Sequence, residues 1–369
     1  MIGSLGGPAA RTDFDGGRLA VARRLRRLTK TALAKKVGVT PTAITQFEKG
    51  HSRPSPAVAA SLSLQLGLPR EFFGVGGRLT RLPAAEAHFR SLRSTSAASR
   101  EQALAFGELS LELVDLVSAY VELPLANLPS LDLPEELDET DIIMAAAATR
   151  AAWEVGPGPL PSVVQLLEAN GVIVLRLPDT TDRAVNAFST DSGDRPLVFL
   201  AQGREDKARS RFDASHETGH LVLHPDTEPG SKIVENQANT FAAELLMPRE
   251  EIIDSLPRRI DWPTFHALKQ HWGVSLRALI YRAHHLGVLS ESSYRRANQQ
   301  LSIWGLPEPG SLGLAESPQL LTLARQVMVE NGIDFENVMA AGRISDEVKE
   351  LVIRVATEEM PRVQMGPGR

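Results

Sequence analysis

Residues 211–224 read Arg-Phe-Asp-Ala-Ser-His-Glu-Thr-Gly-His-Leu-Val-Leu-His, and this stretch decides how the larger part of the chain folds. His216 and His220 are four residues apart, so on an α-helix both imidazoles project from the same face. Glu217 lies next to that face, where its carboxylate can take a proton from a water on a metal held by the two histidines. The pattern predicts a helix that carries two zinc ligands and a general base.

A catalytic zinc usually has three protein ligands and a water, so the two histidines leave one ligand to be found. Straight helix would separate His224 from His216 by ~12 Å, whereas Zn–N bonds are only ~2.1 Å. His224 is therefore excluded unless the helix breaks, and no glycine lies between His220 and His224 to allow a reversal. The next helix, expected within residues 231–248, offers Glu235 as the third ligand.

A second diagnostic stretch is Leu28-Thr-Lys-Thr-Ala-Leu-Ala-Lys-Lys-Val-Gly-Val-Thr-Pro-Thr-Ala-Ile-Thr-Gln-Phe-Glu-Lys-Gly50. Gly38 can adopt the positive φ of a tight turn. Thr40 is a good N-cap and Pro41 suits the first position of a helix. The stretch therefore predicts two short helices joined by a turn, which is typical of a helix-turn-helix module.

In such a module the N-terminal part of the second helix enters the DNA major groove, while the first helix crosses the backbone. Thr42 and Gln46 would then face base edges, and Lys30 would contact a phosphate. The complete set of candidate DNA-contacting residues is Lys30, Thr31, Thr40, Thr42, Gln46 and Lys49.

The distribution of charge supports this placement. Residues 11–55 hold eleven Lys and Arg against three Asp and Glu, whereas the remainder holds 29 basic and 42 acidic side chains within a net charge of −5. An acidic body is repelled by a polyanion. We therefore expect only the N-terminal segment to bind nucleic acid.

Composition limits the other classes of function. The chain has no cysteine, so a metal must be bound by His, Asp, Glu or water. No run approaches the ~18 apolar residues of a membrane span, and the first thirteen residues lack a signal-peptide pattern. We expect a cytoplasmic protein that does not contact a membrane.

The order of helical and strand patterns along the chain predicts its domains. The predicted fold is multidomain and mainly α, with an all-α helix-turn-helix domain followed by an α+β zincin-like domain. About three strands, at Val172–Leu175, Ala184–Phe188 and Leu197–Leu200, should form a small sheet with hairpin-like connections. The predicted divisions are a disordered tail (1–13), the helix-turn-helix domain (14–75), a helical linker (76–139), the zinc domain (140–300) and a C-terminal helical extension (301–369).

The N-terminal module resembles a known family. Residues 14–73 are similar to the lambda-repressor/Cro (Xre) family, including the exit Phe47-Glu-Lys-Gly50 and a further helix that ends near Gly67. The resemblance implies binding to operator DNA. Single modules of this kind usually bind paired half-sites as dimers, so a homodimer is expected.

Roughly residues 140–300 are similar to the ImmA/IrrE family of zinc metallopeptidases. Four segments carry the resemblance: the His216-centred motif, the Glu-x-x-Ala-Asn-x-Phe-Ala-x-x-Leu-Leu-Met-Pro segment that starts at Glu235, Asn186-Ala-Phe-Ser, and Gly273-Val-Ser-x-x-Ala-Leu-x-x-Arg-Ala. One departure is Thr218, where relatives usually carry an apolar residue. The resemblance implies that Zn²⁺ is bound by His216, His220 and Glu235, and that Glu217 is the general base.

Together, the two resemblances predict a bacterial transcriptional regulator. It would bind an operator and hydrolyse a peptide bond, either in a partner repressor of the Xre type or in itself. Two alternatives remain open. In one, the peptidase-like domain is catalytically idle and senses zinc, a peptide or a small ligand; in the other, the chain is a toxin–antitoxin component.

Overall fold

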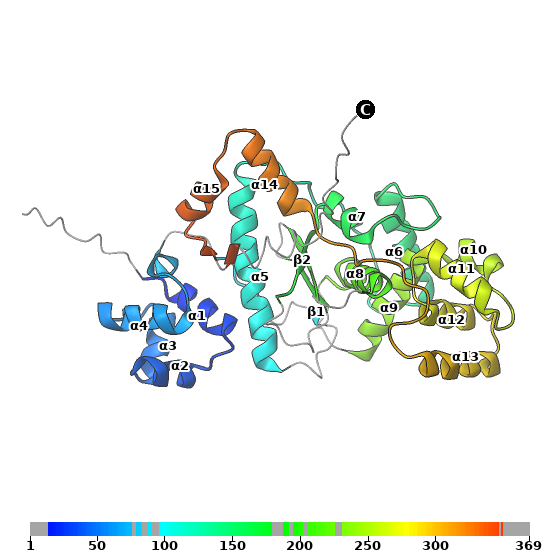
Figure 1. Ribbon diagram of the computed structural model, residues 1–369, viewed down its shortest axis with the longest axis horizontal. Helices are drawn as coiled ribbons and strands as arrows, with labels where there is room; N and C mark the ends of the chain where they lie inside the picture. Colours follow the sequence, from blue (N-terminus) through cyan, green and yellow to red (C-terminus); the bar gives the residue numbers. More distant parts are fainter. Residues whose placement is uncertain are drawn as a thin grey trace, which may run out of the picture. The chain divides into compact units, whose positions relative to one another are not determined.

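The computed structural model describes residues 14–75, 79–82, 88–89, 96–178, 187–191, 195–201, 206–225, 231–346 and 348–349. The chain is mainly helical with one small sheet, as predicted (Figure 1). It divides into two compact units, one of which combines Met1–Arg81, Ala97–Val121 and Val327–Leu351, while the other combines Leu82–Ser96, Glu122–Gln326 and Val352–Arg369. The predicted tail over 1–13, Asn186 and the end of the predicted C-terminal extension, residues 350–369, lie outside the described residues.

Unit 1 begins with short helices whose ends follow the local sequence signals. Gly38 has a φ of 71° at the end of the second helix, and the Thr40 hydroxyl caps the third by accepting from the Ala43 amide at 3.1 Å. Leu33 and Ile44 are fully buried between the two helices. These elements are α1 (Gly16–Leu25), α2 (Lys30–Val37), α3 (Pro41–Glu48), α4 (Pro56–Leu66) and the 3₁₀ helix η1 (Arg70–Phe73).

A long helix from the predicted linker packs within unit 1. This helix, α5 (Ala97–Ser118), contacts α1, and its buried Glu112 forms an ion pair with the buried Arg18. A second ion pair joins Arg24 to Glu108, and the Gln102 amide donates to the Leu25 carbonyl at 3.0 Å. The helix is thus held to the helix-turn-helix elements by buried polar contacts. The predicted domain boundaries themselves stay predictions.

The sheet of unit 2 has the strand order β1-β3-β4-β2. β3 and β4 form an antiparallel pair, with Phe188 opposite Phe199, but β2 runs parallel to β4. The expectation of hairpin-like connections throughout was therefore wrong for β2, which is separated from β3 by β4 and cannot pair with its neighbour in sequence. The strands are β1 (His88–Phe89), β2 (Ile173–Arg176), β3 (Ala187–Asp191) and β4 (Pro196–Leu200).

Helix α8 (Lys207–Leu223) lies against β3, β4 and α9 (Lys232–Leu246). The approach of α8 to α9 is close: a methyl group on Gly219 would lie 3.1 Å from the Phe241 ring and 3.2 Å from the Ala238 Cα. Glycine at this position therefore allows side chains of the two helices to meet. The other helices of unit 2 are α6 (Glu139–Ala152), α7 (Val163–Ala169), α10 (Arg249–Ile252), η2 (Ile253–Ser255), α11 (Trp262–Trp272), α12 (Leu276–His285) and α13 (Glu291–Trp304).

The predicted C-terminal helical extension contributes α14 (Leu320–Glu330) and α15 (Phe335–Ala341). The start of α14 is bound by Glu168 of α7, whose carboxylate accepts from the backbone amides of Gln319 at 2.9 Å and Leu320 at 3.0 Å. Burial raises the pKa of Glu168 to about 7, although these two hydrogen bonds act in the opposite direction.

The raised pKa of Glu168 predicts a pH dependence of stability. Between pH ~4.5 and ~7 the native state retains a proton that the unfolded chain releases, so the free energy of unfolding should fall as pH rises through this window. Between pH 5 and 8 the wild type should lose on the order of 1–3 kcal/mol of unfolding free energy through this group. Glu168→Gln keeps an acceptor oxygen but cannot ionise, so it should not show this loss. Urea denaturation at both pH values measures it. The exposed Glu136→Gln is the control, and an unchanged pH slope in Glu168→Gln would contradict the assignment.

Candidate metal centre and DNA-binding surface

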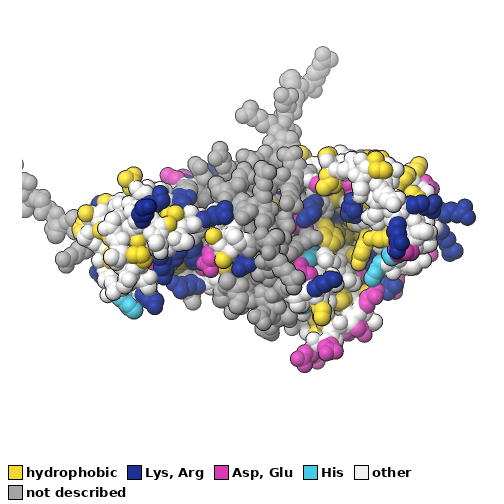
Figure 2. All heavy atoms as spheres, turned by 90° about the horizontal axis from the view of Figure 1, so that it is seen from below, with side chains coloured by type: hydrophobic (Ala, Val, Ile, Leu, Met, Phe, Trp, Pro, Cys, Tyr) yellow, Lys and Arg dark blue, Asp and Glu magenta, His cyan; other side chains and the backbone are white. Residues whose placement is uncertain are grey.

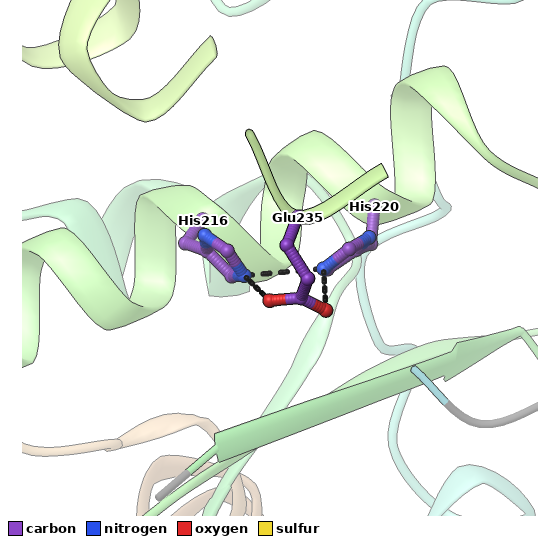
Figure 3. A group of neighbouring side chains, drawn as sticks. All are labelled: His216, His220 and Glu235. Carbon is purple, nitrogen blue, oxygen red and sulfur yellow. Dashed lines mark hydrogen bonds and ion pairs between the residues drawn. The ribbon is translucent and has the colours of Figure 1, made fainter. Parts of the chain in front are cut away.

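Helix α8 places the His-Glu-x-x-His segment in the interior of unit 2. His216, Glu217 and His220 are all fully buried. Glu235 reaches them from the first turn of α9, and Figure 3 shows its carboxylate pointing at the two imidazoles. The structure therefore brings together the three residues that the sequence analysis proposed as ligands.

The spacing of the donor atoms matches the requirement of a tetrahedral ion. Nε2 of His216 and Nε2 of His220 are 3.1 Å apart, and the Glu235 carboxylate oxygens lie 3.5 Å and 3.7 Å from them. Two ligands on a tetrahedral zinc at ~2.1 Å are ~3.4 Å from each other. Two imidazoles and one carboxylate at this spacing are a donor set that fits Zn²⁺.

Hydrogen bonds behind the two imidazoles orient them for metal binding. Nδ1 of His216 is 3.0 Å from the Asn239 side-chain oxygen, which can only accept, so Nδ1 carries the proton and Nε2 presents a lone pair. Nδ1 of His220 is 3.2 Å from Nδ1 of His224, and Nε2 of His224 is 2.9 Å from the Gln237 oxygen. Because that oxygen fixes the proton of His224 on Nε2, Nδ1 of His224 is an acceptor for His220.

His224 is therefore a neighbour of the metal centre rather than a ligand, in agreement with the prediction that it cannot complete the site. We expect His224→Ala to weaken zinc binding by about 10–100-fold, the range typical of residues that orient a ligand from behind. Competition with a chromogenic chelator measures the affinity. His271→Ala, an exposed histidine on α11, should leave it unchanged, and equal affinities in all three proteins would contradict this role for His224.

Glu217 is positioned by a strand that the sequence analysis did not connect to it. The Ser189 hydroxyl on β3 donates to Oε2 of Glu217 at 2.8 Å, and both side chains are fully buried. Ser189 is the last residue of the quoted Asn-Ala-Phe-Ser segment, which is the one signal that could have singled it out. The departure at Thr218 is accommodated, because its buried hydroxyl donates to the Ala214 carbonyl at 2.8 Å.

Arg211 anchors the helix that carries the site. Its buried guanidinium forms an ion pair with Glu316 at 2.5 Å and donates to the carbonyls of Leu160 at 2.9 Å and Pro161 at 3.1 Å. The motif arginine thus joins α8 to two segments distant in sequence. Its role is structural support of the helix.

Most of the candidate DNA-contacting residues are on the surface of unit 1. Thr31, Thr40, Thr42, Gln46 and Lys49 are exposed. Lys30 is half-buried, and its ammonium lies 3.2 Å from a Glu48 oxygen. Glu48 also accepts from Arg23 at 2.6 Å, so this carboxylate links α1, α2 and α3. The sequence analysis assigned Lys30 to phosphate and did not foresee this network.

These elements define two classes of domain: a helical DNA-binding module and a zincin-like domain with a two-histidine, one-glutamate centre. Comparison with known families agrees, since residues 19–73 match the family model described as helix-turn-helix and residues 168–284 match the one described as IrrE N-terminal-like domain. The chain therefore joins a helix-turn-helix domain of the Xre type to an IrrE/ImmA-like peptidase domain.

Comparison with individual proteins adds little. No curated protein matches the chain. Among solved structures, PlcR of Bacillus thuringiensis in complex with the peptide PapR7 and DNA is similar at 12% sequence identity over 88% of this chain and 90% of that chain, with a TM-score of 0.15. A TM-score this low supports no structural or functional argument. Among the described residues, no helix has the length and apolar character needed to cross a bilayer.

Proposed function

We propose that this chain is a DNA-binding transcriptional regulator whose second domain is a zinc-dependent endopeptidase. The substrate would be a partner repressor of the Xre type or the chain itself. The observation that carries the proposal is the meeting of His216, His220 and Glu235 at tetrahedral spacing next to a buried Glu217. A purely structural zinc site does not require a general base such as the Glu217 carboxylate.

Bound zinc would polarise the scissile carbonyl and make a water acidic enough to lose a proton near neutral pH. Glu217 is the general base that takes this proton and later gives it to the leaving amine. Ser189 holds one oxygen of Glu217 by its hydrogen bond, which leaves the other oxygen to receive the proton. His216 and His220 are held in the required tautomers by Asn239 and His224.

In unit 1, the proposed base contacts come from Thr42 and Gln46 on α3. The proposed phosphate contacts come from Lys30, Thr31, Thr40 and Lys49. The chain would bind paired half-sites as a homodimer. We expect Gln46→Ala to cost about 1–3 kcal/mol in operator binding and to relax specificity at one base pair. Lys49→Ala should instead weaken all sequences alike and lower the salt slope by about one. Binding to a library of operator variants at two salt concentrations distinguishes these effects, and identical profiles for both variants would contradict the assignment.

The proposal as a whole is tested by measuring zinc content, DNA binding and proteolysis on one preparation of the full chain. About one zinc per chain, selective DNA capture and a defined cut in the chain or in one member of a panel of Xre-type repressors would support it. Zinc and DNA binding without any cut would favour a sensing domain. DNA binding without zinc under metal-replete conditions would overturn the peptidase assignment, and weak DNA binding with tight binding of a neighbouring toxin would favour a toxin–antitoxin role.

A further inference from the structure

A second site lies in unit 2, on elements that do not form the metal centre. A pocket of about 640 Å³ is lined by the η2–α11 loop, the start of α11 and the first turns of α13. Its charged lining consists of three arginines and no carboxylate, and its hydroxyl groups come from the N-terminus of α13. The arginines are Arg258, Arg259 and Arg296, and the serines are Ser290, Ser292 and Ser293.

The local charge of this region differs from that of the acidic body around it. Residues 257–304 hold seven Lys and Arg against two Asp and Glu. Figure 2 shows Lys and Arg side chains gathered at the end of unit 2 that these helices form. The expectation that only the N-terminal segment binds nucleic acid used the charge balance of the whole remainder of the chain, and that average hides the basic character of residues 257–304.

The two acidic side chains of the segment are committed to other groups. Asp261 caps α11 by accepting from the Thr264 amide at 3.3 Å, and its other oxygen accepts from the Thr264 hydroxyl at 2.8 Å. Glu291 pairs with Arg295 at 2.7 Å and with His284 at 2.9 Å. Among the described residues, no carboxylate forms an ion pair with Arg258, Arg259 or Arg296. Three guanidinium groups therefore line the pocket with no carboxylate paired to them in the part of the chain that the structure describes.

We propose that this pocket binds the phosphate groups of a small phosphorylated ligand of nucleotide size. Guanidinium groups match phosphate oxygens with paired hydrogen bonds, and the amides at the N-terminus of the fourteen-residue α13 favour an anion. The volume falls within the ~300–1,000 Å³ of small-molecule sites. Ile260 and Trp262 add an apolar wall for the remainder of the ligand. The three arginines are exposed at the rim of the pocket, where they can reach the phosphates of a bound ligand.

The site leaves the proposed chemistry at Glu217 untouched, so it adds a ligand-responsive element to the protein whether or not the peptidase assignment holds. Its test is titration calorimetry of the full chain with ATP, inorganic pyrophosphate and adenosine at ~0.1 M salt. ATP and pyrophosphate should bind with a Kd below ~1 mM, whereas adenosine should bind far more weakly because it lacks phosphate. Arg296→Ala should weaken ATP binding by at least ~10-fold.

The chain provides a matched control in the adjacent Arg295, which is also exposed on α13 but pairs with Glu291 and does not line the pocket. Arg295→Ala should change the ATP affinity less than ~2-fold. Equal weakening by both variants would show diffuse attraction and overturn the site, as would adenosine binding as well as ATP. Absence of ATP binding, with loss of random-sequence DNA binding in Arg296→Ala, would instead assign the surface to DNA. Arg258→Ala provides a second variant if Arg296→Ala does not fold.

Discussion

Glu217→Gln is expected to abolish peptide hydrolysis while leaving zinc and operator binding intact. Glutamine has nearly the shape of glutamate and its oxygen can still accept the Ser189 hydroxyl, so the buried site should keep its packing. It cannot take up a proton, and general-base catalysis contributes about 10²–10⁴-fold to such reactions. The rate of cleavage should therefore fall by at least ~100-fold, as followed by mass spectrometry of the substrate.

A matched variant at Ser189 distinguishes the role of Glu217 as the base from the role of the residue that orients it. Ser189→Ala removes only the hydrogen bond that orients Glu217, so its cleavage rate should fall by less than that of Glu217→Gln. If Glu217→Gln cuts as fast as the wild type, Glu217 is not the base. If no protein is cut and gene regulation is the same in both chains, the domain acts as a sensor instead.

Glu235→Gln is expected to weaken zinc binding by more than ~100-fold, beyond the effect of His224→Ala. The change replaces an anionic ligand, whose oxygens lie 3.5 Å and 3.7 Å from the two imidazole nitrogens, with a neutral amide. Carboxylates are common zinc ligands, whereas an amide oxygen is a much poorer donor for this ion. Zinc content after dialysis against a weak chelator measures the loss.

The control for this change is on the same helix. Asn236 is the next residue on α9 and is exposed, so Asn236→Ala should retain its zinc. DNA binding should persist in Glu235→Gln, because the helix-turn-helix elements belong to unit 1. A Glu235→Gln chain that holds zinc as tightly as the wild type would rule out Glu235 as the third ligand.

Some features of this molecule could be predicted from the sequence without knowledge of the tertiary fold. The capped ends of α2 and α3 and the shared face of His216 and His220 depend on residues at most a few positions apart, where helix geometry alone decides the outcome. The charge of residues 257–304 was also present in the sequence, and a shorter counting window would have revealed it.

Contacts between segments that are distant in the sequence were decided only by the tertiary structure. Glu235 could be proposed from the next helix, but its approach to the imidazoles depends on how closely α8 and α9 pack at Gly219. The hydrogen bond from Ser189 to Glu217 depends on the placement of β3 beside α8, and the inclusion of α5 in unit 1 depends on its buried ion pairs with α1. The sequence determined the local chemistry of each helix, because a helix repeats every few residues; which helices and strands meet was set by packing over the whole chain.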